Sequence, residues 1–360
     1  MVRTGHDKYE RLIARVQALP PTPTAVAHPC DAASLEGAVD AARLGIIEPI
    51  LVGPPTRILA AAKAANLDIT GFEIVEAPHS HAAAARAVEL VREGRAQALM
   101  KGSLHTDELM AEVVSGTTGL RTERRISHCF VLDVPSYPKP LIITDAAINI
   151  APSLKDKVDI VQNAIDLAHA AGIERPRVAI LSAMETVNPD VASTVEAAAL
   201  CKMADRGQIT GGILDGPLAL DNAINLEAAR IKHIDSPVAG QADILVVPDL
   251  EAGNMLAKSL SFLAEADCAG IVLGARVPIA LTSRADSVLS RLASTALVAL
   301  VANHRRVQTA KAVRRGNAAP ACSAPVGGQS LRNHHRRTAF ARSTPEPVSR
   351  RVLGPADREA

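Results

Sequence analysis

Short apolar runs alternate with longer amphipathic segments along most of the chain. The short runs have the length of buried strands, and the longer segments place apolar residues three or four positions apart, as helices do. Strands separated by such helices are typical of parallel β-α-β units with helices on both faces of a sheet. The pattern therefore predicts an α/β protein with mainly parallel sheets. The expected strands are residues 26–27, 46–52, 72–76, 98–101, 141–144, 178–181, 212–214, 244–247, 270–273 and 279–281. The expected helices are residues 31–43, 57–65, 81–92, 104–114, 155–170, 191–206, 251–264 and 288–306, with a further helical stretch that ends at residue 230.

Two breaks in the alternation indicate how the chain is organised. The strand that ends near residue 133 returns through a proline-rich turn directly into the next strand, which predicts a hairpin rather than a crossover. Residues 149–153 include a proline and interrupt the periodicity, so we place a domain boundary there. We therefore expect two α/β/α domains, at residues 1–150 and 151–287, followed by a long helix.

Composition is that of an ordinary globular protein. At 360 residues the chain has the length of about two domains. Hydrophobic residues make up 48% of it, but with no Trp, two Tyr and four Phe the core must be built from aliphatic side chains. No apolar run approaches the ~20 residues of a transmembrane helix, and the first residues are polar. We therefore expect a cytoplasmic protein that does not enter a membrane.

The last part of the chain differs from the rest in charge and pattern. Residues 308–360 hold ten Lys or Arg against three Asp or Glu, which leaves 29 against 35, a net −6, in the preceding residues. This segment has five prolines and no apolar periodicity, so we expect a disordered basic tail, with a functional basic arm as the alternative. Because there are few aromatic residues to stack on bases, we do not expect nucleic-acid binding.

The five cysteines are scattered without a C-x-x-C pair, which argues against a zinc site or a disulfide framework. We therefore expect reduced cysteines and no metal. Cys129 follows His128, and a catalytic cysteine would need such a partner. Neighbouring side chains in a strand point to opposite faces, however, so structural roles are favoured for both residues. The same holds for His233, which has no partner at ligand spacing.

The densest group of chemically active side chains is Ser283-Arg284-Ala285-Asp286, between the last short strand and the last helix. We expect these residues on the first turn of that helix, where free backbone N–H groups and the positive dipole end suit a phosphate or carboxylate ligand. A capping box made by Ser283 and Asp286 is the simpler explanation of the spacing. Arg284 argues for a ligand, because a cation in a first turn opposes the dipole and needs an anion nearby.

Weaker signals follow other strands. Lys101, Gly102 and Ser103 lie between a strand and a helix, which makes them a candidate anion cradle. Gly253 lies in a helical start, where a glycine can indicate close approach of the backbone to a ligand. Asp215 and Asp221 bracket a Gly-Pro loop at the end of a strand; a metal pair is possible there, although turn and capping roles are favoured. The chain has no G-x-G-x-x-G and no Walker loop, so nicotinamide and ATP are not expected.

Three long motifs, at residues 216–223, 242–254 and 274–287, resemble those of the phosphate acetyl/butyryltransferase family, and residues 137–149 resemble its butyryl branch. The resemblance covers residues 8–307. It implies a homodimer of two-domain α/β/α subunits, with an interdomain cleft in which coenzyme A and acyl phosphate meet. It also implies that the second domain carries the coenzyme A and phosphate site, and that the last helix returns to complete the first domain at residues 288–307.

Members of this family exchange an acyl group between coenzyme A and inorganic phosphate, which suggests roles for several residues. Arg284 would hold the phosphate with help from Arg125, since two parallel N–H bonds match phosphate oxygens. Ser283 would orient the thiol or the tetrahedral oxygen. The acetyl branch has its proposed base at the position of Ser290, so Asp286 is the substitute candidate for taking the proton of a thiol whose pKa is about 8.5. The other expected substrate-binding residues are Lys101, Gly102, Ser103, Asp221, Gly253 and Asn254.

The resemblance implies a phosphate acyltransferase that moves an acetyl or other short acyl group by direct attack within a ternary complex. Acyl-CoA, inorganic phosphate and acyl phosphate, such as acetyl phosphate, are the expected substrates, with no permanently bound cofactor, no metal and no covalent intermediate. A non-catalytic acyl-CoA sensor is one alternative. A metal-dependent dehydrogenase of related architecture is another, and it would need paired aspartates to chelate a divalent ion.

Overall fold

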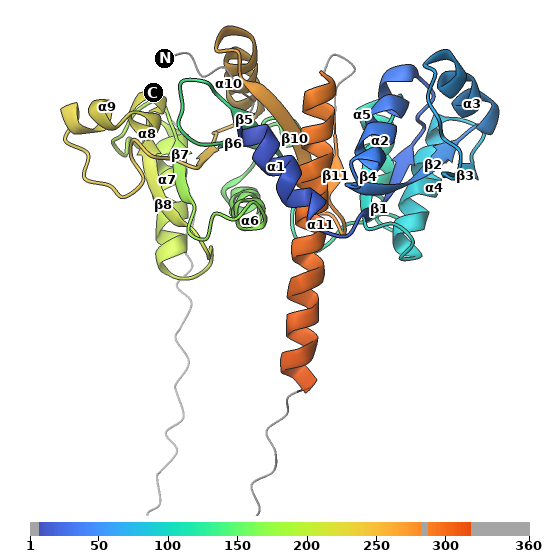
Figure 1. Ribbon diagram of the computed structural model, residues 1–360. Helices are drawn as coiled ribbons and strands as arrows, with labels where there is room; N and C mark the ends of the chain where they lie inside the picture. The colour runs from blue at the N-terminus through green and yellow to red at the C-terminus, as the bar shows by residue number, and fades with distance from the viewer. Residues whose placement is uncertain (1–6, 282–286, 318–360) are drawn as a thin grey trace, which may run out of the picture. The chain divides into compact units, whose positions relative to one another are not determined.

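The computed structural model describes residues 7–281 and 287–317, and the strands in these residues form one sheet of eleven (Figure 1). The strand order is β3-β2-β1-β4-β11-β10-β5-β6-β9-β7-β8. A mixed α/β fold with a mainly parallel sheet is thus confirmed. The strands are β1 Thr22–Ala27, β2 Ile47–Gly53, β3 Glu73–Glu76, β4 Ala98–Lys101, β5 Ser127–Asp133, β6 Leu141–Thr144, β7 Arg177–Leu181, β8 Ile213–Leu218, β9 Ile244–Val246, β10 Asp267–Leu273 and β11 Ile279–Ala280. The helices are α1 Asp7–Gln17, α2 Ala32–Arg43, α3 Pro55–Ala64, α4 Ser80–Arg92, α5 Thr106–Val113, α6 Leu154–Ala170, α7 Ala192–Asp205, α8 Leu220–Ile224, α9 Leu226–Ile231, α10 Leu250–Leu263 and α11 Val288–Asn317.

The first half of the sheet follows the predicted β-α-β pattern. β1 pairs in parallel with β2 and β4, β3 joins β2, and the late strand β11 joins β4 in parallel. α2 shows how local sequence sets an element: Asp31 caps it by accepting a hydrogen bond from the Ser34 N–H at 2.8 Å. Gly45 then follows the helix end with φ +70°, a backbone conformation that costs glycine little.

The two long strands in the middle of the sheet, β5 and β10, pair antiparallel. Their register runs from Asp267 opposite Asp133 to Leu273 opposite Ser127. β5 and β6 also pair antiparallel, which confirms the predicted hairpin. These pairings reverse the strand direction, so β6, β9, β7 and β8 run opposite to β1–β4. The carboxyl end of β4 therefore lies on the side of the sheet where β6 begins, and the carboxyl end of β6 on the side where β4 begins. We call these two sides, where strands begin and end, the two edges of the sheet.

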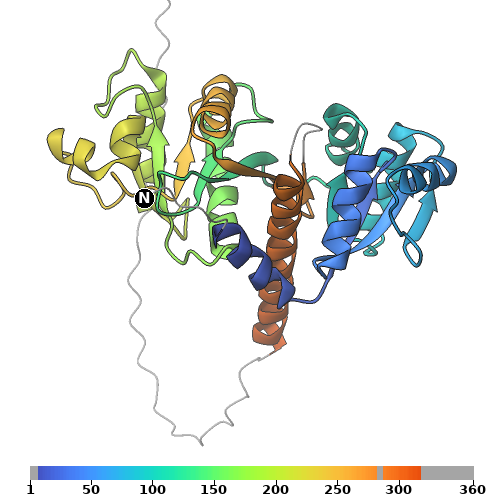
Figure 2. The same cartoon turned by 45° about the horizontal axis from the view of Figure 1, so that its top comes forward.

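The two faces of the sheet are covered differently. One face carries a continuous apolar core under α1, α2, α3, α6, α7 and α11. The other face carries two separate cores, one under α4 and α5 and one under α8, α9 and α10. α11 lies over the middle of the sheet, where the side-chain Oγ of Ser294 accepts a hydrogen bond from the Gly270 N–H at 2.9 Å. α1 lies beside α11 in both views (Figures 1 and 2).

The division into two domains near residue 150 stays a prediction. The described chain up to Arg314 forms one compact unit. Its sheet is continuous, because β10 and β11, which come from the second predicted domain, pair with β5 and β4 of the first.

The structure departs from the prediction near both ends. α1 was not expected, because its sequence is mostly polar, yet Ile13 and Val16 are buried against the continuous core. At the other end, α11 continues to Asn317, so the prediction of disorder is wrong for residues 308–317. This stretch contains good helix formers such as Gln308 and Ala310, and a helix satisfies its own backbone without burial. Residues 318–360 lie outside the described residues.

The predicted loop that starts at Asp215 is also corrected, because β8 continues to Leu218. β8 is an edge strand, so Pro217, which has no N–H to donate, can lie within it without leaving a neighbouring strand unpaired. Among the described helices, we find none with both the length and the apolar character needed to span a membrane.

Candidate active site

The central candidates, Ser283, Arg284 and Asp286, lie outside the described residues. The structure does define the two elements that flank them. The chain enters this segment from β11, which runs parallel with β4, and leaves it into α11. The N-cap of α11 is Ser287, whose Oγ accepts a hydrogen bond from the Ser290 N–H at 3.1 Å. The described part of α11 thus has its own cap at Ser287, while the capping box suggested for Ser283 and Asp286 lies outside the described residues.

Ser290 is the third residue of α11, the position at which a capping box has its carboxylate. Here Ser287 Oγ donates to Ser290 Oγ at 3.1 Å. Two serine side chains thus form the cap of α11, where a capping box would combine a serine with a carboxylate.

Lys101, Gly102 and Ser103 lie where β4 ends beside β1. The Gly102 N–H donates to the Ala27 carbonyl and the Ser103 N–H to the His28 carbonyl, each at 2.9 Å. Both amides are therefore used inside the protein, and the anion site expected at Lys101, Gly102 and Ser103 stays a prediction. A side chain on Gly102 would lie 2.6 Å from the His28 carbonyl oxygen, so the glycine allows the two strand ends to approach. The Lys101 side chain is buried at this edge.

His28 was not singled out from the sequence, but it lies at the centre of this edge. Its Nδ1 is 3.0 Å from the Oγ of Ser103, which also donates to the His28 carbonyl at 2.8 Å. Burial lowers the pKa of the imidazole below its usual value, and the guanidinium of Arg57 lowers it further. Nε2 is buried and has no hydrogen-bond partner among the described residues. The ring is therefore a neutral polar group at the carboxyl ends of β1 and β4.

Arg125 lies just before β5, where its partly exposed side chain contacts Asn149 and Asp156. Its Nε donates to Asn149 Oδ1 at 2.7 Å, and its Nη1 is 3.4 Å from a carboxylate oxygen of Asp156. The Asn149 amide in turn donates to Asp145 at 2.5 Å and to the Ile126 carbonyl at 2.9 Å. Asp145 and Asn149 are 3% and 4% exposed, so a buried amide and carboxylate anchor Nε of an arginine whose side chain is 51% exposed. Both belong to the stretch that resembles the butyryl branch, which could have drawn attention to them.

Gly253 and Asn254 lie on the first turns of α10 and contact the same segment. A side chain at Gly253 would lie 3.0 Å from both the Asp145 carbonyl oxygen and the Ala146 Cβ. Asn254 Nδ2 donates to the Ala146 carbonyl at 3.2 Å. Close packing of α10 on the segment after β6 therefore explains the glycine without a ligand. Asp249 caps α10, because its carboxylate accepts a hydrogen bond from the Ala252 N–H at 2.9 Å.

Asp221 lies apart from these groups, on α8. Its carboxylate is 3.1 Å from the Lys232 ammonium, which lowers the pKa of the acid, and its side chain is exposed. Lys232 also reaches Glu185 at 3.3 Å. Within the described residues, no group of three or more His, Cys, Asp and Glu is placed to hold a metal ion.

The sequence candidates thus fall at two edges of the sheet. Lys101 and His28 lie at the carboxyl ends of β4 and β1, the edge at which the chain leaves β11 toward Ser283. Arg125, at the amino end of β5, lies with the carboxyl end of β6 at the opposite edge. The strand directions that separate the two groups come from pairings between distant parts of the chain, which the local pattern did not contain.

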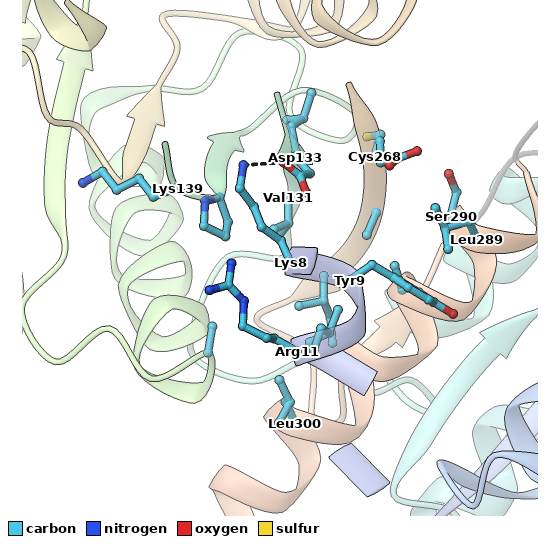
Figure 3. A pocket seen from close by; sticks show the side chains of 18 of the residues that line it. Lys8, Tyr9, Arg11, Val131, Asp133, Lys139, Cys268, Leu289, Ser290 and Leu300 are labelled. Carbon is cyan, nitrogen blue, oxygen red and sulfur yellow. Dashed lines mark hydrogen bonds and ion pairs between the residues drawn. The ribbon is translucent and has the colours of Figure 1, made fainter. Parts of the chain in front are cut away.

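A cavity of about 410 Å³ lies between α1, β5, β10 and α11 (Figure 3), and we call it the α1–α11 cavity. Its lining includes Leu289 and Ser290 from the first turn of α11, and Lys8, which pairs with Asp133. α1 was not predicted from the sequence, and so this cavity was not predicted either.

Comparison with known proteins agrees with the motifs. The family model described as "Phosphate acetyl/butaryl transferase" matches residues 79–299. The chain is 66% identical to the phosphate acetyltransferase of Rhizobium meliloti over 307 residues, 85% of this chain and 97% of that protein. It is 42% identical to the phosphate butyryltransferase of Clostridium acetobutylicum over 297 residues, 82% of this chain and 99% of that protein. Among solved structures, a branched-chain phosphotransacylase from Enterococcus faecalis matches with a TM-score of 0.69 and 32% identity, over 78% of this chain and 99% of that one.

The fold and these similarities define an acyltransferase. The chain belongs to the phosphate acetyl/butyryltransferase family, as its motifs indicated.

Proposed function

We propose that the protein transfers a short acyl group between coenzyme A and inorganic phosphate, without metal, bound cofactor or covalent intermediate. The observation that carries the proposal is similarity over nearly the whole length of proteins named phosphate acetyltransferase and phosphate butyryltransferase. In one direction the thiol of coenzyme A attacks the carbonyl carbon of an acyl phosphate. A bond forms between the sulfur and the acyl carbon. The bond between that carbon and the bridging phosphate oxygen breaks, and phosphate leaves with the bonding electrons.

The segment between β11 and α11 supplies the proposed catalytic groups. Arg284 holds the phosphate oxygens with two parallel hydrogen bonds, and Ser283 orients the thiol or the tetrahedral oxygen. Asp286 takes the thiol proton, because a thiol of pKa about 8.5 is mostly protonated at neutral pH. Lys101, at the sheet edge from which β11 leads to this segment, is the second cation we assign to the phosphate. Arg125, to which the family resemblance gave that role, lies at the opposite ends of the strands, where its Nε donates to Asn149.

A direct assay tests this proposal. Acetyl-CoA or butyryl-CoA is incubated with phosphate, and thiol release is followed. Arg284→Ala should raise KM for phosphate by ~100-fold, since one bidentate charged contact contributes about 3 kcal/mol. Arg125→Ala is the matched control and should change that KM less than threefold. If neither substrate shows phosphate-dependent thiol release, the acyltransferase activity is excluded. If the two substitutions change KM for phosphate equally, the assignment of phosphate binding to Arg284 is excluded.

The two alternative functions are less well supported. A non-catalytic sensor would bind acyl-CoA without turnover in this assay. A metal-dependent dehydrogenase would need grouped acidic ligands, and the similar proteins reported above are named acyltransferases or phosphotransacylases instead.

The protein is also proposed to be a cytoplasmic homodimer. α10 supports the assembly, because Met255, Phe262 and Leu263 on this helix are 62%, 82% and 84% exposed. Met255 and Phe262 are seven residues apart and so share one helix face. Exposed apolar side chains grouped in this way are typical of an interface, and a second copy of the chain is the partner that the family resemblance implies.

A further inference from the structure

β1 and β4 pair in parallel, but the helices that follow them pack on opposite faces of the sheet. α2, after β1, covers the continuous core, whereas α5, after β4, covers a separate core on the other face. Parallel α/β sheets bind their ligands at such a topological switch point, outside the carboxyl ends of the two strands. His28, Lys101 and Ser103 lie at this place, which we call the β1–β4 switch point.

The hydrogen bonds of Ser103 determine which ring nitrogen of His28 carries the proton. The Ser103 hydroxyl donates to the His28 carbonyl at 2.8 Å, and a hydroxyl has one proton to give. Its oxygen therefore accepts from His28 Nδ1, which is 3.0 Å away, and also from the Cys30 N–H at 3.3 Å. Nδ1 is thus the protonated nitrogen of the neutral ring, and Nε2 holds a lone pair.

Nε2 of His28 is a buried hydrogen-bond acceptor that the described residues leave unpaired. The residue is 5% exposed, and Nε2 has no partner among these residues. An unpaired buried acceptor is unfavourable, and a ligand with an O–H or N–H group would supply the partner. The backbone of His28 has φ +55°, a conformation uncommon for residues other than glycine and concentrated at functional sites. Because neighbouring atoms cover Nε2, a ligand reaches it only when a side chain there moves aside.

The charges around the ring favour an anionic ligand. Burial and, after it, the Arg57 guanidinium lower the pKa of the His28 imidazole, which keeps the ring neutral. Asp31 and Glu108 act in the opposite direction, but their carboxylates already cap α2 and α5. Lys101, buried at the end of β4, brings an ammonium group to the same place. A neutral acceptor among cations suits an anion that still carries a proton.

Inorganic phosphate has this combination of charge and proton. At neutral pH it is an anion that keeps at least one P–O–H group. Sulfate has the same shape but no proton at this pH, so one of its oxygens would face the Nε2 lone pair. A phosphate monoester is also mostly without a proton there, because its second pKa is about 6.

We propose that His28 Nε2 accepts a hydrogen bond from the P–O–H group of inorganic phosphate, and that this contact makes the protein select phosphate over sulfate. A site built to accept a hydrogen bond rejects a ligand that lacks the donor, because the acceptor is then left unpaired. The inference rests on the proposed function, of which phosphate is a substrate, and it adds the residue that determines the choice of anion.

His28→Asn tests this role by direct binding. Asparagine tolerates the left-handed backbone and can donate to Ser103 in place of Nδ1, but it has no atom at the position of Nε2. Isothermal titration calorimetry of the full chain at neutral pH and constant ionic strength measures Kd for phosphate and for sulfate. The wild type should bind phosphate at least tenfold more tightly than sulfate, and His28→Asn should bind the two within threefold. His233→Asn, the same change at an exposed residue with φ +54°, is the matched control and should keep the wild-type ratio.

Ser103→Ala is a second test that keeps the ring. Without the Ser103 oxygen the imidazole is free to carry its proton on Nε2 and donate to sulfate. The preference for phosphate should therefore fall at least threefold. If thermal unfolding shows that His28→Asn is not folded, the ratio in Ser103→Ala decides, and an unchanged ratio would contradict the proposal.

Calorimetry requires no turnover, so the two proposals fail separately. Phosphate-selective binding that depends on His28, without thiol release in the activity assay, would refute the acyltransferase and not the phosphate contact. Equal constants for the two anions in an active wild type would overturn the role of His28 alone, as would a preference that survives in folded His28→Asn. Glycerol phosphate is the probe for monoesters. If the substitution weakens its binding and not that of inorganic phosphate, the assignment to inorganic phosphate is wrong.

Discussion

His128 is buried in β5, and one of its two ring nitrogens has no hydrogen-bond partner among the described residues. Its Nδ1 has no hydrogen-bond partner in the described part of the chain, and the ring packs edge-on against Phe130 with centroids 4.4 Å apart. Desolvation lowers the pKa of the imidazole to about 4, against a smaller opposing effect of the Asp145 carboxylate. Gly270 on β10 leaves room for the ring, since a side chain there would lie 3.0 Å from His128 Nε2.

The low pKa of His128 makes stability depend on pH. The unfolded imidazole titrates near 6.5, so between pH 6.5 and pH 4 the unfolded state binds a proton that the folded state excludes, and stability falls as pH falls. At pH 5 this group should lower the free energy of unfolding by about 2 kcal/mol relative to pH 7. Denaturant unfolding of His128→Gln should therefore show a smaller loss between these two pH values than the wild type. His233→Asn, at an exposed position with a left-handed backbone that asparagine tolerates, is the control. An unchanged pH dependence in His128→Gln would contradict this account.

At the scale of elements, α10 and the segment after β6 are held together by close packing and hydrogen bonds. Asp145 accepts hydrogen bonds from the N–H groups of Ala147 and Ile148 at 2.9 and 3.0 Å, which fixes the turn on which Gly253 packs. The same turn continues to Asn149 and so to Arg125. A shift of α10 would therefore reach the start of β5.

Gly253→Ala tests this coupling. The added methyl would lie 2.7 Å from Val247 Cγ2, so α10 must move, and overpacking of this kind costs about 1–3 kcal/mol. We expect the melting temperature to fall by about 2–4 °C for each kcal/mol. Gly116→Ala is the control, because nothing lies within 4 Å of the added atom there. An unchanged melting temperature with a raised KM for coenzyme A would instead favour the ligand contact that the sequence suggested for Gly253.

At the scale of the whole molecule, the apolar face of α10 predicts the assembly state. Phe262→Glu places a charge on that face at a side chain that is 82% exposed in the single chain. The substitution should turn the proposed dimer into a monomer, since an unpaired charge buried in an interface is strongly unfavourable. Light scattering after size-exclusion chromatography measures the mass. Val307→Glu, at an exposed position on α11, should leave it unchanged. A monomeric wild type would rule out the dimer proposal.

Most elements could be predicted from the sequence, because local features determine them. Asp31 and Asp249, for example, cap α2 and α10 by accepting hydrogen bonds from backbone N–H groups three residues further on. The order of the strands in the sheet could not be predicted, because β11 joins β4 and β10 joins β5 through contacts between residues more than a hundred positions apart. The same limit applies to the site. Lys101 and Arg125 are close in sequence, but the direction of β5 and β6 places Arg125 at the other edge from Lys101.

The late pairing of β11 with β4 also bears on how the chain folds during synthesis. β4 ends at Lys101, but the strand that covers its open side begins only at Ile279. A nascent chain therefore exposes an unpaired edge of the first strands until nearly all of the sheet has left the ribosome. Contacts over such sequence separations are slow to form, so a truncation before β11 should produce aggregation rather than a small stable domain.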